Sequence, residues 1–71
     1  MKLVRLSGHI INLDKVLSME YDGQNYTALV TYKYLYVLTK KQLIRGVLEA
    51  DFERVYRKWD EHSKTIVLYV K

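Results

Sequence analysis

Few residues in this chain are of types that do chemistry. The sequence of 71 residues has no cysteine and only two histidines, His9 and His62. Thiol catalysis and thiolate metal sites are therefore excluded, and a Ser-His-Asp triad would have to use one of these two histidines. Neither histidine lies in a nucleophile motif. His9 follows a glycine turn and is expected to be an ordinary histidine at the end of a strand.

Metal, phosphate and acid–base sites are also poorly supported. Asp60 and His62 could reach one metal ion at the surface, but two ligands are too few for a specific site. The glycines are isolated, so there is no phosphate-binding loop. Unless it oligomerises, a chain of this length also lacks the walls for a pocket of roughly several hundred Å³. We therefore predict a protein that is not an enzyme and has neither a metal nor another cofactor.

A basic cluster is the first candidate binding site. Lys40 and Lys41 fall in the first turn of a predicted helix, where the helix dipole disfavours cations. Residues placed against a local rule are candidates for function. Together with Arg45 and the free amides of the helix start, the lysines would bind a phosphate or a carboxylate. The alternative is an ordinary exposed pair of lysines.

The tyrosines are the second candidate. Tyrosine occurs seven times, against one phenylalanine and one tryptophan. In one unbroken strand, four of them share a face: Tyr26, Tyr32, Tyr34 and Tyr36. Such a row beside Lys33 would stack nucleic-acid bases, form a protein interface, or pack as half-buried core under the helix. Tyr69, in a predicted final strand, belongs to the same expected surface.

The elements that position these residues begin with three short strands, predicted at residues 3–6, 9–13 and 16–21. Ser7-Gly8 supplies the first turn, and residues 22–25 are the strongest hairpin signal. A loop of about two residues would pair Tyr21 with Gln24, and one of about four residues would pair Tyr21 with Tyr26. Both registers place the same residues on the core face, which are Leu17, Met19, Tyr21, Tyr26, Ala28 and Val30.

Residues 26–39 are rich in strand-forming types throughout. One unbroken strand would be roughly 46 Å long, at about 3.3 Å per residue, which exceeds the size of so small a domain. A second hairpin near residues 32–34 is therefore predicted. The alternative is one long strand that leaves the domain to pair with another chain.

A long helix is predicted over residues 40–59. Thr39 and Gln42 match a capping box, and apolar residues follow at spacings of three and four. Leu48 and Phe52 are expected to be buried on its apolar face. A polar connector over residues 60–64 leads to a final strand at 65–70. The predicted fold is a single α+β domain over residues 1–71, with a mainly antiparallel sheet of about four to six strands, one helix packed on one face and a C-terminal strand.

Composition agrees with a folded protein, since 49% of the residues are hydrophobic and 28% are charged. The formal net charge of +4 fits a nucleic-acid or other anionic partner, but is also an ordinary solubility charge. No apolar run is long enough for a membrane span, and the N-terminus lacks the apolar segment of a secretion signal. A cytoplasmic location is expected.

The opening of the chain resembles a known family. The residues that carry the likeness are Lys2-Leu3-Val4-Arg5-Leu6-Ser7-Gly8, then Asn12-Leu13-Asp14, Val16 and Glu20. This pattern is similar to the K-L-x-R-L-N-G opening of the small FlbD-type (SwrD-like) flagellar accessory proteins, and it covers roughly the first twenty residues. The turn at 22–25 and the residues at 32–34 depart from the family's pattern. The resemblance implies a non-catalytic motility accessory protein and transfers no functional residues.

The sequence as a whole predicts a small non-enzymatic binding module, such as an accessory, regulatory or inhibitor protein of the size that phages often encode. The expected interface is a tyrosine-rich sheet face or edge with Tyr32, Tyr34, Tyr36 and Tyr69. One alternative is a nucleic-acid-binding domain that uses Lys40, Lys41, Arg45 and the tyrosines; another is the flagellar accessory protein. Because a short chain has a marginal core and spare apolar strand surface, a homodimer is also predicted.

Overall fold

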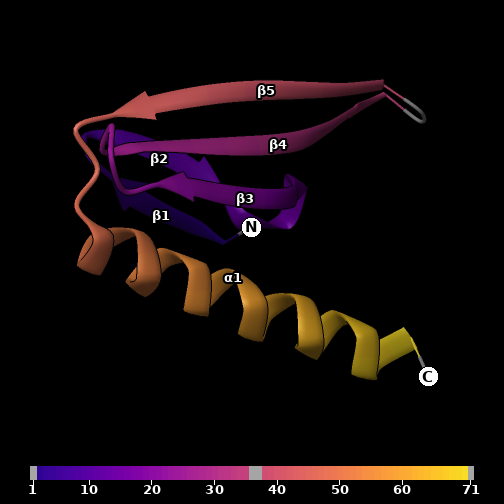
Figure 1. Ribbon diagram of the computed structural model, residues 1–71. Coiled ribbons are helices and arrows are strands. Elements are labelled where there is room, and N and C mark those ends of the chain that lie inside the picture. The colour runs from indigo at the N-terminus through magenta and orange to yellow at the C-terminus, as the bar shows by residue number, and fades with distance from the viewer. Residues whose placement is uncertain (1, 36–37, 71) are drawn as a thin grey trace.

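The computed structural model describes residues 2–35 and 38–70, with the backbone alone for Leu35 and for residues 63–70. Five strands are followed by one helix (Figure 1). In chain order the elements are β1 (Leu3–Leu6), β2 (His9–Asn12), the short 3-10 helix η1 (Leu13–Lys15), β3 (Val16–Asp22), β4 (Thr27–Leu35), β5 (Leu38–Arg45) and α1 (Glu49–Val70). The predicted α+β class is confirmed.

The strands form two antiparallel sheets, one of β1 and β2 and one in the order β3-β4-β5. The prediction of one sheet was therefore wrong. The reason is η1, which redirects the chain after β2, so that β3 begins a second sheet. Asn12 caps η1, because its side-chain oxygen accepts a hydrogen bond of 3.1 Å from the backbone amide of Asp14. The predicted turn at Ser7-Gly8 is confirmed, with positive φ angles of 47° and 82°.

The prediction of a helix from residue 40 was wrong, because residues 38–45 form β5. Each of these residues gains a cross-strand partner on β4, such as Val30 for Gln42 and Ala28 for Ile44. Such long-range pairing outweighs the local capping pattern. Gly46, with a φ of 70°, follows the end of β5. The helix begins three residues later, with the acidic residues Glu49 and Asp51 in its first turn.

The predicted final strand at residues 65–70 was also wrong, because α1 continues to Val70. Strands β4 and β5 pair as an antiparallel hairpin, so the predicted second hairpin is confirmed and the alternative of one long strand is not. The reversal comes after Leu35, which pairs with Leu38, and not at residues 32–34. Residues 36–37, which connect the two strands, lie outside the described residues.

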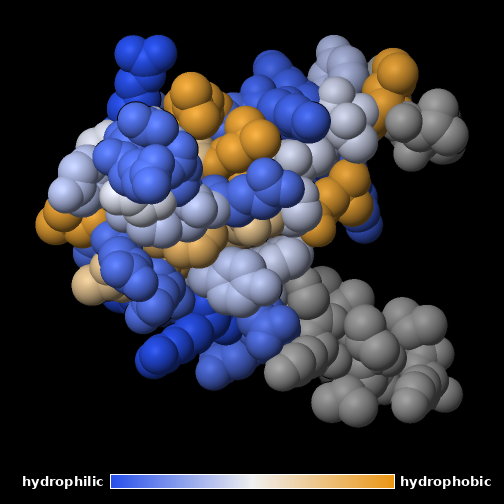
Figure 2. All heavy atoms as spheres, viewed as in Figure 1, coloured by the Kyte–Doolittle hydropathy of each residue, from blue (hydrophilic) through white to orange (hydrophobic). Residues whose placement is uncertain are grey.

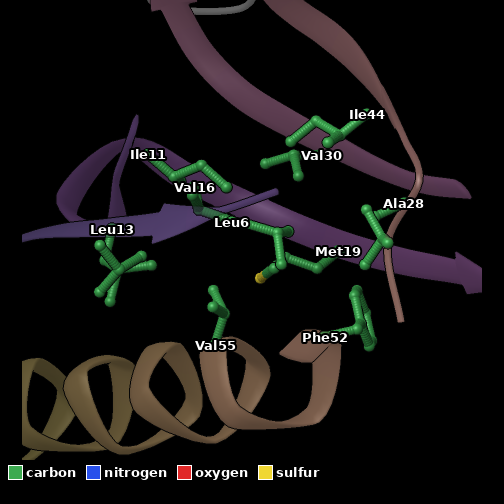
Figure 3. Close-up of a cluster of buried hydrophobic side chains, with 12 residues drawn as sticks. Leu6, Ile11, Leu13, Val16, Met19, Ala28, Val30, Ile44, Phe52 and Val55 are labelled. Atoms are coloured by element: carbon green, nitrogen blue, oxygen red, sulfur yellow. The ribbon is translucent and has the colours of Figure 1, made fainter. Parts of the chain in front are cut away.

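The core lies between the two sheets and α1, and Figure 3 shows its side chains pointing toward one another from all three. The helix contacts β1, β3 and η1, and so covers one side of the molecule. The rings of Tyr21 and Phe52 stack with centroids 5.0 Å apart. The buried core residues are Val4, Leu6, Ile11, Leu13, Val16, Met19, Ala28, Val30, Ile44, Val47, Phe52 and Val55.

The first hairpin differs from its predicted pairing. Tyr21 pairs with Ala28, which leaves residues 23–26 in the loop. Since this register differs from the predicted ones by an even step, Met19, Ala28 and Val30 are buried as predicted. Leu17 is exposed because a register shift lies between Val16 and Ser18, and Tyr26 is exposed because it lies in the loop.

Val47 fixes the connection between β5 and α1. It is fully buried, and its amide donates a hydrogen bond of 2.8 Å to the carbonyl oxygen of Tyr26. The hydroxyl of Tyr21 donates a bond of 2.8 Å to the carbonyl oxygen of Val47. The next residue, Leu48, was predicted to be buried but has 60% of its surface exposed, because it precedes the helix that was expected to contain it.

No helix in the described part of the chain is long and apolar enough to cross a membrane.

Candidate functional site

The side of the molecule opposite the helix carries an unpaired strand edge. In the described residues β5 is hydrogen-bonded only to β4, and β2 only to β1. Figure 1 shows β5 as the strand of its sheet that lies farthest from α1. The Ser7 hydroxyl, in the turn before β2, lies 3.1 Å from the carbonyl oxygens of Arg45 and Gly46 and donates to them. Ser7 therefore joins the β1–β2 turn to the end of β5, and no described strand pairs with the outer edge of β5.

A groove of about 480 Å³ lies between these elements. Its lining comes from β2, β4 and β5 and consists of Ile10, Asn12, Tyr32, Lys40, Lys41 and Gln42. The groove thus brings together a tyrosine and the paired lysines, a combination that the sequence analysis considered only for its nucleic-acid-binding alternative. Tyr32 and Lys40 are direct partners in the register of β4 and β5.

Tyr32 forms a fixed wall of this groove. Its hydroxyl donates a hydrogen bond of 2.7 Å to Oε1 of Gln42, and its ring packs against the core. Burial raises the pKa of the Tyr32 hydroxyl above its ordinary value of 10.0, so the group is a neutral donor at physiological pH. Because its ring and hydroxyl are both engaged, Tyr32 shapes the groove and is not a free stacking platform.

Exposed apolar side chains accompany the lysines on the β4–β5 hairpin. Tyr34 has 62% of its surface exposed, Leu38 has 54% and Leu43 has 53%. Since side chains alternate along a strand, Leu38 and Lys40 lie on the face of β5 that carries Gln42, and Lys41 and Leu43 lie on the other. Figure 2 shows hydrophobic and hydrophilic side chains interspersed over this part of the surface.

The whole formal net charge of the chain comes from this hairpin. Residues 27–45 hold four of the twelve lysines and arginines and none of the eight acidic residues. The remaining eight cations equal the acids in number, so the rest of the chain is formally neutral. The four cations are Lys33, Lys40, Lys41 and Arg45. A surface of one sign attracts partners of the opposite sign.

The predicted site residues are only partly brought together. Lys40 and Lys41 lie on β5 and not at a helix start, so the predicted anion site made with helix amides was wrong. Arg45 lies at the far end of the strand, paired with Thr27. Tyr36 and the side chain of Tyr69 lie outside the described residues, and the backbone at Tyr69 is helical rather than extended.

Three contributors to this surface were missed by the sequence analysis. Ile10 and Asn12 line the groove, and Leu38 is exposed beside it. Their proximity depends on how β2 is placed against β5, which no local pattern indicates. The charge asymmetry, by contrast, is readable from the sequence, since no acidic residue occurs between Asp22 and Glu49.

The two histidines have structural settings. Nδ1 of His9 lies 3.2 Å from the carbonyl oxygen of Ser7, at the start of β2. Nε2 of His62 contacts the carboxylate of Asp14, which links α1 to η1 and holds the pKa of Asp14 below its ordinary value. The described residues that line a hollow of about 340 Å³ beside His62 are Lys2, Lys58, Glu61 and His62 itself.

In comparisons with protein-family models, with curated proteins and with solved structures, the chain has no significant match. The likeness of its opening to FlbD-type flagellar proteins stays a prediction, and the functional argument depends on the residues and their geometry.

Proposed function

We propose that the protein is a non-enzymatic binding module that acts through the β4–β5 hairpin. The observation that carries this proposal is the coincidence of three features on one hairpin: the entire net charge, an unpaired strand edge, and exposed apolar side chains. Edge strands and exposed apolar groups are both sites of association between proteins.

A protein partner is favoured over a nucleic acid by the state of the tyrosines. Single-strand binders stack successive bases on exposed aromatic rings. Of the tyrosines on the described part of the hairpin, Tyr32 is packed against the core and bonded to Gln42, which leaves Tyr34 as the exposed ring. One platform gives little stacking energy, whereas a free edge suits a polypeptide.

Site-specific photocrosslinking in cells that naturally make the protein tests this proposal. A photoreactive amino acid would replace Leu38 on the hairpin or, as the matched control, Leu3 on β1. Both leucines have 54% of their surface exposed, so the two probes report location rather than accessibility. We expect a discrete crosslinked protein from position 38 and not from position 3. Equal crosslinking from both positions, or crosslinking from position 3 alone, would refute the role of the hairpin.

A further inference from the structure

We infer that β5 accepts an extended acidic segment of a partner protein as an added strand. This inference rests on the proposed binding role of the hairpin and adds to it the chemistry and conformation of the partner. An antiparallel edge strand presents a row of unpaired backbone amides and carbonyls, which an extended peptide can satisfy. Over its eight residues, β5 offers this row beside a groove of about 480 Å³.

The side chains of β5 define what the added strand should carry. Leu38, Lys40, Lys41 and Leu43 form the pattern apolar-x-cation-cation-x-apolar. The pattern reads the same in both directions, and each strand face carries one leucine and one lysine. Its complement is apolar-x-acid-acid-x-apolar, and the symmetry lets such a segment bind in either orientation. Cross-strand pairs of opposite charge stabilise a sheet, as do apolar pairs.

A second copy of this chain fits the edge less well than an acidic strand. Antiparallel pairing of two β5 strands would bring the lysine pair of one copy beside the lysine pair of the other. Like charges placed across a sheet are destabilising. Lysine on an edge strand is a common device against such self-pairing, and it leaves the edge available to a chain of opposite charge. The homodimer becomes an outcome of the test below.

The test uses a labelled eight-residue peptide, as long as β5, of sequence Thr-Val-Thr-Glu-Glu-Thr-Val-Thr. Binding to the full chain is followed by fluorescence anisotropy at low salt. One control peptide has the same composition with its acids at the ends, Glu-Val-Thr-Thr-Thr-Thr-Val-Glu. Two further controls carry N-methyl groups on alternate residues, one set on each edge of the peptide. Sedimentation of the free protein shows whether it is already a dimer.

We expect the first peptide to bind about tenfold more tightly than the peptide with terminal acids, because only the first places both acids beside the lysines. N-methylation of the edge that faces β5 should abolish binding, whereas methylation of the other edge should leave it intact. Equal loss with both methylated peptides, or equal retention, would overturn strand addition. Hydrogen exchange should show new protection confined to amides of residues 38–45.

Two charge variants separate the lysine pair from total charge. K40E/K41E should weaken binding of the first peptide by about tenfold or more, and R57E/K58E on the exposed face of α1 should leave it nearly unchanged. If K40E/K41E fails to fold, K40Q/K41Q makes the same test with neutral side chains. An equal effect of both charge reversals would contradict a site on β5.

The outcomes distinguish this inference from the proposed function. Tighter binding of an eight-nucleotide oligothymidylate than of any peptide, or a dimer held through β5, would overturn the inference. The hairpin would remain the binding surface in both cases if photocrosslinks still form at position 38. Crosslinks at position 3 alone would refute the proposed function itself.

Discussion

The side of the molecule that carries α1 and the side that carries the edge of β5 differ in how far their groups are engaged. On the helix side, polar groups are paired across elements: Trp59 Nε1 donates to the Val16 carbonyl at 3.2 Å, and the Arg54 guanidinium donates to the Arg5 carbonyl at 3.1 Å. On the open side, β5 keeps a free edge with lysines and exposed leucines. The comparison indicates that stability is concentrated where α1 packs and that the edge of β5 contributes little to it.

The largest expected difference between the two sides is in side-chain truncation. Phe52→Ala should lower the free energy of unfolding by about 3–5 kcal/mol, because it removes a buried ring that stacks on Tyr21. Leu38→Ala should change it by less than about 0.5 kcal/mol, because this side chain is exposed. Urea denaturation followed by circular dichroism measures both. Comparable losses would mean that the open side is as strongly packed as the helix side.

Hydrogen bonds that join separate elements give a second, smaller contrast. Trp59→Phe keeps an aromatic ring but leaves the Val16 carbonyl without this donor, and should cost about 1–2 kcal/mol. Tyr32→Phe removes the bond to Gln42 beside the groove and should cost about 0.5–1 kcal/mol, because water entering the groove would replace the lost donor. The same denaturation measurement applies. A larger loss of unfolding free energy for Tyr32→Phe than for Trp59→Phe would contradict the expectation that the helix side contributes more to stability.

Backbone strain at two positions gives effects of opposite sign. Gly46, at a φ of 70°, should resist substitution, and Gly46→Ala should destabilise the fold by about 1 kcal/mol. Tyr26 adopts a φ of 52°, which is unfavourable for a bulky residue, and Tyr26→Asn should stabilise the fold by about 0.5–1 kcal/mol. Thermal melting of both variants is sufficient. A stabilising Gly46→Ala would show that the backbone after β5 differs from that described.

The pH dependence of stability gives the smallest effect, and it compares two aspartates. The bond with His62 lowers the pKa of Asp14 on the helix side, and bonds with Asn25 and Gln24 lower the pKa of Asp22 in the β3–β4 loop. A carboxyl whose pKa is depressed on folding stabilises the fold above its unfolded pKa, ordinarily 3.8, and loses this contribution as the pH falls through its folded pKa.

Asp14→Asn and Asp22→Asn should therefore each reduce the loss of stability on acidification below about pH 4. Urea midpoints at pH 7 and pH 3 measure this slope. His62→Ala should flatten the acid slope of the wild-type protein but leave that of Asp14→Asn unchanged. An additive effect of the two substitutions would show that His62 contributes to the acid slope through a group other than Asp14.

Sequence patterns correctly predicted the turns, whose conformation depends on local chemistry. They misplaced the elements whose conformation depends on pairing with residues far away in the sequence. The turns at Ser7-Gly8 and near Asp22-Gly23 were predictable, because positive φ angles and aspartate side-chain bonds are local properties. The strand over residues 38–45 was mistaken for a helix because Thr39 and Gln42 match a cap. The side chains of residues 38–45 alternate between two faces of a sheet, and only their pairing with β4 shows this. Along most of the strand those partners are ten or more residues away in the sequence.

The binding surface was predictable in its chemistry and not in its assembly. Lys40, Lys41 and Tyr32 were identified from composition and position, and only the nucleic-acid-binding alternative placed them in one site. Their convergence depends on the hairpin register, which places Tyr32 opposite Lys40. The lysines conflicted with a helix start, which the sequence analysis interpreted as a sign of function; the conflict arises instead because these residues form a strand. Glu49 and Asp51, which suit a helix start, lay a few residues farther on.

The double anchoring of Val47 has a consequence for the order of folding. Both of its backbone polar groups are bonded to residues 21 and 26, so the path into α1 is defined only after the β3–β4 turn has closed. We therefore expect the helix to dock late, onto strands that are already paired. During synthesis the strands also leave the ribosome before α1, because they precede it in the chain. In stopped-flow experiments, Tyr21→Phe should then accelerate unfolding with little effect on the folding rate, as for contacts formed after the transition state.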